Sequence, residues 1–215
     1  MEVGLLLFHV LDVIGTISFA ISGAMVAVKK NVDLLGVLVL GNLTAVGGGV
    51  LRDMLLGSAP PKAFVDSQFV ALASVASLLL FVVARCFKEQ YIAREKLADT
   101  VNNLFDALGL GAFSVTGVQV AQEAGHGENM FFCVFLGVLT GVGGGLIRDV
   151  VADQMPFVLV KRIYAVASML GAMGYYLLLR LGLDQGTSAV AGIMLVFTIR
   201  VLATKYKWNL PHALA

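Results

Sequence analysis

The sequence predicts an all-α integral membrane protein with seven transmembrane helices, arranged as two inverted three-helix repeats plus a seventh helix. Three observations predict this fold: a composition too apolar for a soluble protein, apolar stretches of spanning length, and a duplication that relates two halves. Of 215 residues, 59% are hydrophobic and 13% charged, and the mean hydropathy is +0.90. A soluble domain does not need so much apolar sequence for its core.

The spans follow when the chain is cut at charged and turn-forming residues. About 20 helical residues cross a hydrocarbon core of about 30 Å. The runs are continuously apolar rather than alternating, which favours helices over a β-barrel. The first run lacks the basic region of a signal peptide, so it is kept as a span. The predicted spans cover residues 4–28, 34–56, 64–84, 101–122, 130–151, 162–181 and 187–204.

Basic residues are distributed unevenly between the two sides that these spans define. One side carries Lys29, Lys30, Arg85, Lys88, Arg94, Lys96, Arg148, Lys161, Arg162, Arg200, Lys205 and Lys207, and the other carries Arg52, Lys62 and Arg180. The side rich in lysine and arginine faces the cytoplasm in most membrane proteins. This predicts an N-terminus outside the cell and a cytoplasmic C-terminus.

Two segments of the chain recur. DVIGTISFAISGA from Asp12 matches DALGLGAFSVTGV from Asp106, and TAVGGGVLRDMLLGSAP from Thr44 matches TGVGGGLIRDVVADQMP from Thr140. Each unit holds three spans, so the second copy enters the membrane from the opposite side, as in the inverted repeats of many transporters. The predicted organisation is a first repeat at 1–84, a cytoplasmic linker at 85–100, a second repeat at 101–182, and a seventh helix with its tail at 183–215.

A glycine triplet lies inside the second span and another inside the fifth. They consist of Gly47, Gly48 and Gly49, and of Gly143, Gly144 and Gly145. Three glycines cost a helix roughly 3 kcal/mol relative to alanine, so a kink or a short unwound stretch is expected in both spans. Irregular backbone is tolerated in a membrane where it is buried or lines a wet cavity, which favours a pathway. Close packing of helices through small residues is the alternative.

An arginine and an aspartate follow each triplet, and each half has one further aspartate within a span. The pairs are Arg52 with Asp53 and Arg148 with Asp149. They are expected at opposite ends of one route, unless they are interfacial charges. By depth, Asp12 should lie near Arg52, and Asp106 near Arg148. A structural ion pair and a cation-binding role are both open for the two further aspartates.

Neutral oxygen atoms for a permeating cation are expected from polar side chains in the spans, although each such side chain more often bonds a neighbouring helix. The candidates are Ser18, Asn42, Thr44, Ser114 and Thr140. No motif for a metal, a cofactor or nucleotide-driven pumping is present. The net charge of +1 gives no reason to expect a nucleic-acid partner. An enzyme is not expected either, because no nucleophile, base and oxyanion-binding group recur together.

The paired GGGxxRD segments at 47–53 and 143–149, in two three-span units followed by a seventh span, resemble those of the prokaryotic relatives of the trimeric intracellular cation (TRIC) channels. That family is also described as a glycine transporter and as a former domain of unknown function. The resemblance implies a homotrimer in a bacterial inner (plasma) membrane, surrounded by lipid. It implies a pathway in each subunit, kinked at the triplets, that conducts K⁺ or Na⁺. The alternative is a secondary transporter of a small amino acid such as glycine, whose carboxylate and ammonium an arginine and an aspartate could hold.

Overall fold

Helices form every regular element in the described part of the chain. The computed structural model describes residues 2–160 and 163–208. Its elements are α1 (Glu2–Lys29), α2 (Leu34–Leu55), α3 (Lys62–Val65), α4 (Gln68–Cys86), α5 (Lys88–Ala93), α6 (Glu95–Ala121), the π-helical turn η1 (Gln122–His126), α7 (Met130–Val151), α8 (Phe157–Val160), α9 (Tyr164–Arg180) and α10 (Gln185–Lys205). The predicted all-α class is confirmed.

Six of these helices are long and apolar enough to cross a membrane: α1, α2, α4, α6, α7 and α10. The chain is therefore an integral membrane protein. The sixth predicted span corresponds to α9, which has 17 residues and at 1.5 Å per residue is about 25 Å long. That length is short for a hydrocarbon core of about 30 Å, so the count of seven spans remains a prediction.

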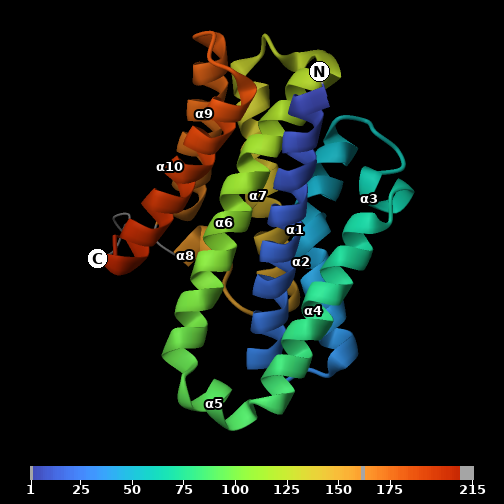
Figure 1. The fold of residues 1–215 in the computed structure, drawn as a ribbon, viewed down its shortest axis with the longest axis vertical. Coiled ribbons are helices and arrows are strands. Elements are labelled where there is room, and N and C mark those ends of the chain that lie inside the picture. The colour runs from blue at the N-terminus through green and yellow to red at the C-terminus, as the bar shows by residue number, and fades with distance from the viewer. Residues whose placement is uncertain (1, 161–162, 209–215) are drawn as a thin grey trace.

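Four long helices form the centre of the bundle, and the others flank it (Figure 1). Helices α1, α2, α7 and α6 contact one another in a ring, α4 packs on α1 and α2, and α9 packs on α6 and α7. Helix α10 lies along α9 and α6 on the outside of the second half. The N-terminus lies at one end of the bundle and α5 at the other.

Some boundaries differ from those predicted. The segment expected as a linker at 85–100 contains α5 and the first six residues of α6. Its residues KEQYIA and EKLADT are polar but good helix formers, which hydropathy alone does not detect. The third span begins later than expected because α3 and a turn precede it, after Pro60 and Pro61. Lys161 and Arg162, counted above among the cytoplasmic residues, lie outside the described residues, as do residues 209–215 of the tail.

Side-chain caps explain where three of the helices begin. Asp33, Asn129 and Asp184 accept hydrogen bonds from backbone N–H groups three residues later, at 2.8, 3.0 and 2.8 Å. Each bond satisfies a donor that the helix itself leaves unpaired. The bond from the Thr187 backbone lowers the pKa of Asp184 below that of an ordinary aspartate. These caps place α2, α7 and α10 at the residues where the apolar runs start.

Candidate functional site

The centre of the bundle is a very close crossing of α2 and α7. A Cβ atom at Gly48 would collide with the carbonyl oxygen of Thr140, and one at Gly144 would collide with that of Thr44. Each glycine belongs to a triplet, and each carbonyl belongs to the threonine that starts the other repeated segment. The two halves therefore meet backbone to backbone, through contacts that are equivalent in the two repeats.

The expected unwound stretch is not formed. Helices α2 and α7 are continuous α-helices through both triplets. The helix propensity that glycine loses is compensated by the close approach of two backbones, which only residues without a Cβ atom permit. The expectation of an interruption is therefore wrong. A bend at the triplets remains a prediction.

The other glycines of the triplets face different surroundings. Cβ atoms at Gly47 and Gly143 would lie 2.8 and 3.1 Å from side chains across the crossing, those of Ile147 and Leu51. At Gly49 the nearest atom would be a guanidinium nitrogen of Arg52, 3.7 Å away. The first two positions of each triplet therefore serve the helix crossing, and Gly49 leaves room for a side chain.

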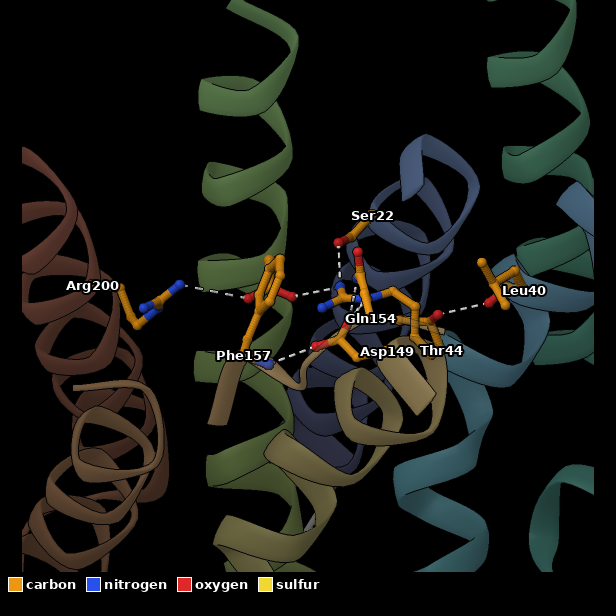
Figure 2. A network of polar contacts seen from close by, with 9 residues as sticks. Ser22, Leu40, Thr44, Asp149, Gln154, Phe157 and Arg200 are labelled. Atoms are coloured by element: carbon orange, nitrogen blue, oxygen red, sulfur yellow. Dashed lines mark hydrogen bonds and ion pairs between the residues drawn. The ribbon is translucent and has the colours of Figure 1, made fainter. Parts of the chain in front are cut away.

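The threonine side chains at the crossing pack against the other two central helices. The hydroxyls of Thr44 and Thr140 donate to carbonyl oxygens one turn earlier in their own helices, at 2.6 Å each; Figure 2 shows the bond from Thr44 to Leu40. The Thr44 hydroxyl lies over Gly23 of α1, and the Thr140 hydroxyl over Gly117 of α6. The two predicted threonines are thus brought together at the centre.

A buried network of charges fills one end of the crossing. The Arg148 guanidinium donates to Asp149 at 2.8 Å, to Asp106 at 2.8 Å and to the Ser22 hydroxyl at 2.7 Å. The side chains of Arg148, Asp106 and Asp149 are fully buried. The Arg148 guanidinium also lies 4.6 Å from the centre of the Phe157 ring. The expected pairing of Asp106 with Arg148 is confirmed.

A second buried arginine reaches this network from α10. Arg200 lies 3.8 Å from the second carboxylate oxygen of Asp106, and its guanidinium lies 4.6 Å from the centre of the Tyr164 ring. Figure 2 shows Arg200 reaching the network from the side opposite Ser22. Arg200 was counted above only among the basic residues of the cytoplasmic side, and it has no repeated partner. We call Asp106, Arg148, Asp149 and Arg200 the charge cluster; its two arginines balance its two aspartates.

The aspartate after each arginine also anchors the following loop. One oxygen of Asp149 accepts from the backbone N–H of Phe157 at 2.7 Å, and the other accepts from Gln154 at 2.8 Å. In the first half Asp53 accepts from the backbone N–H of Lys62 at 2.9 Å. Both bonded N–H groups start short helices, α8 and α3. Part of the predicted role of these aspartates is therefore structural.

A small cavity lies at the opposite end of the crossing, beside α3. Its volume is about 60 Å³, and we call it the α3 cavity. The residues that line it include the polar Asp12, Thr16, Arg52, Asp53, Lys62 and Thr140, together with Gly49, Phe69 and Phe113. Arg52 donates to Asp53 at 2.8 Å. Among the described residues no ion pair joins Asp12 to Arg52, although both line this cavity.

A larger cavity of about 690 Å³, the α5 cavity, lies between the ends of α1, α4 and α6 beside α5. Charged side chains line it, including Lys29, Arg85, Lys88, Glu95 and Asp99, and Lys29 forms ion pairs with Glu95 and Asp99 at 3.0 Å each. Gln154 and Phe157, which bond Asp149 of the charge cluster, also line it. The charge cluster thus borders the α5 cavity.

The remaining predicted polar residues lie away from the crossing or show no polar bond there. Asn42 donates to Ser74 of α4 at 3.0 Å, and the Ser114 hydroxyl lies 2.7 Å from that of Ser168 on α9. These bonds join neighbouring helices, which was the alternative given for them. Ser18 is buried on α1. Within the part of the chain described, no group of three side chains is arranged to hold a metal ion.

Three comparisons relate the chain to known proteins. A family model described as glycine transporter matches it twice, at residues 9–85 and 103–180. A UPF0126 membrane protein of Deinococcus radiodurans is 39% identical over 94% of this chain and 90% of its own length. The UPF0126 inner membrane protein YadS of Escherichia coli K12 is 38% identical over 96% of both chains.

Solved structures share the fold along nearly the whole chain. A structure described in a study of conductance through TRIC cation channels has a TM-score of 0.81 and 36% identity, and covers 95% of this chain and 96% of its own. A prokaryotic TRIC channel in 0.5 M KCl has a TM-score of 0.85 and 30% identity, and covers 95% of this chain and 99% of its own. The similarity therefore includes all the central helices.

Proposed function

Because the chain belongs to the family of prokaryotic TRIC channels, whose family model is described as glycine transporter, we propose that it is a cation channel that passes K⁺ or Na⁺ through each subunit. The observation that carries the proposal is the likeness in fold to TRIC cation channels over 95% of the chain. The position of the two cavities agrees with it, since a polar cavity lies on each side of the crossing between the repeats. Substrate pathways in proteins with inverted repeats lie at that interface.

The proposed pathway runs from the α3 cavity, past the crossing of α2 and α7, to the α5 cavity. In the α3 cavity Asp12 and Thr140 supply carboxylate and carbonyl or hydroxyl oxygens, the ligands that alkali cations take in place of water. The charge cluster closes the route before the α5 cavity, because Arg148 is fully buried and bonded to three side chains. We infer that this structure corresponds to a closed state. Opening then requires Arg148 to move away from Asp106 or Ser22.

The proposed architecture has seven spans, with the repeats at 1–84 and 101–182 in opposite orientations, a cytoplasmic linker at 85–100, and the seventh helix with its tail at 183–215. The double match of one family model supports two repeats. The proposed assembly is a homotrimer in the inner membrane of a bacterium. We propose that the end with α5 is cytoplasmic and that the N-terminus is outside, because the basic residues gather at the α5 end.

Transport of glycine is the second candidate, and one observation favours it. The α3 cavity carries a carboxylate of Asp12, which has no ion-pair partner among the described residues, together with the cations of Arg52 and Lys62. Such a set fits the ammonium and carboxylate groups of a zwitterion. A carrier would bind and release one molecule in each cycle, and a channel would pass many ions in each opening.

Recordings from planar bilayers distinguish the two candidates. If the protein is a channel, recordings under a KCl gradient should show discrete openings, and the current should reverse close to the K⁺ equilibrium potential. Asp12→Asn should lower the K⁺ current several-fold, because it removes the carboxylate from the α3 cavity. The matched control is Asp66→Asn, a partly exposed carboxylate at the same end that does not line the cavity. Electrical silence of the wild type, together with saturable glycine counterflow in liposomes, would contradict the channel.

A further inference from the structure

One part of the repeated sequence is not used by the charges or by the glycine triplets. The matched segments from Asp12 and Asp106 also share a glycine and a phenylalanine, Gly15 with Phe19 and Gly109 with Phe113. The spacing of four residues places each glycine and phenylalanine on the same face of a helix. The two helices that carry them, α1 and α6, pack along each other.

In the structure these four residues interlock. The rings of Phe19 and Phe113 contact each other, with their centres 5.3 Å apart and their planes tilted by 59°. A Cβ atom at Gly15 would lie 2.8 Å from the Phe113 ring, and one at Gly109 would collide with the Phe19 ring. Each ring therefore fills the space that a glycine of the other repeat leaves open. This arrangement obeys the same two-fold relation as the crossing of α2 and α7.

The ring pair lies between the α3 cavity and the charge cluster. Along α1, Asp12 and Thr16 line the cavity, Phe19 follows, and Ser22 bonds Arg148. Steps of three or four residues keep this series on one face of the helix. Helix α6 gives the opposite order, with Asp106 in the cluster and Phe113 in the cavity wall.

The Phe19 ring packs against α7. Phe19 is fully buried, and a Cβ atom at Gly144 would lie 3.6 Å from its ring, so it rests against the closest part of the crossing. Phe113 is 8% exposed and lines the α3 cavity. An ion that leaves the cavity toward the cluster meets apolar carbon atoms and no hydrogen-bonding group of these two side chains.

We propose that Phe19 and Phe113 form an apolar barrier in the cation pathway, distinct from the charge cluster and in series with it. The inference rests on the proposed channel function. Apolar constrictions stop ions because they exclude the water that an ion needs around it. The route therefore has two closures of different chemistry, and opening the charge cluster alone does not open it.

Substitutions at Phe113 test the barrier. Phe113→Ala should raise the K⁺ flux into liposomes several-fold over the wild type, because water can enter the space of the lost ring and each opening of the charge cluster is then sufficient to open the route. Phe8→Ala is the control: Phe8 is the same residue type and lies on α1 like Phe19, but it packs against Tyr175 with ring centres 6.3 Å apart and lines neither cavity. It should leave the flux close to that of the wild type.

A second pair of variants serves if Phe113→Ala does not fold. Phe113→Leu and Phe113→Asn leave side chains with the same branching and the same number of heavy atoms, and the Asn variant should conduct more than the Leu variant, because its amide brings water into the barrier. Flux in these variants no higher than in the wild type, or equal in Leu and Asn, would overturn the apolar barrier while the channel function stands. Absence of cation flux in the wild type and in every folded variant would overturn the channel function itself.

Discussion

The closest contact between the halves gives a sharp prediction about stability. We expect Gly48→Ala and Gly144→Ala to destabilise the protein and Gly49→Ala to leave it as stable or more so. At Gly48 and Gly144 the added Cβ atom meets a backbone carbonyl of the facing helix, that of Thr140 or Thr44 respectively. A backbone atom cannot rotate away as a side chain does, so the helices must separate.

The magnitude follows from a comparison within one triplet. Replacing glycine by alanine gains up to about 1 kcal/mol of helix propensity at Gly48 and at Gly49 alike. Overpacking costs about 1–3 kcal/mol at Gly48, but not at Gly49, where the nearest atom is 3.7 Å away at the end of the Arg52 side chain. The free energy of unfolding should therefore differ between the two variants by about 1–3 kcal/mol.

The assay is reversible unfolding by SDS in mixed micelles, followed by circular dichroism. The same order should appear in the melting temperatures, with Gly48→Ala and Gly144→Ala below the wild type and Gly49→Ala at or above it. Equal stability of Gly48→Ala and Gly49→Ala would refute the backbone contact between α2 and α7. The glycine triplets would then have no role in packing.

The other predictions concern charges. Asp106→Asn should lower the free energy of unfolding by about 3–5 kcal/mol, because it leaves the arginines of the charge cluster without the carboxylate between them. The control Asp66→Asn should change the free energy of unfolding little. Equal losses in the two variants would argue against the charge cluster. The hydrogen bond from Arg180 lowers the pKa of Glu128, so the stability from this pair is present at neutral pH and is lost as the pH falls through that lowered pKa. Arg180→Gln should raise the pKa of Glu128 in a carboxyl NMR titration, and an unchanged value would show that the bridge is absent in solution.

Much of the fold follows from the sequence because the bilayer leaves few choices. Spanning helices need about 20 apolar residues, and the six confirmed spans begin within several residues of the expected positions. The pairing of Asp106 with Arg148 could also be predicted, since both residues lie near the same end of antiparallel spans. The depth of a residue can be read from its place in a span, and depth alone was sufficient for this pair.

The face that each helix turns toward the interior of the bundle could not be predicted in the same way. Asn42 and Ser114 bond to α4 and α9, but lipid and helix neighbours are both apolar, so the pattern does not identify the buried face. Arg200 was missed because an arginine near the end of an apolar span is usually interfacial. A kink or a short unwound stretch was expected at the triplets, with close helix packing as the alternative. Helix propensity does not indicate how closely the backbones of α2 and α7 approach each other.

The central claim is that a cation pathway passes through the α3 cavity of each subunit. Gly49→Cys tests it, because position 49 lines that cavity and has room for a side chain. The background replaces the native Cys86 and Cys133 by serine and alanine. A charged methanethiosulfonate reagent on the side of α3, which we propose is the outside, should block the K⁺ current of Gly49→Cys and not that of the background. A labelled cysteine with undiminished current would contradict the claim.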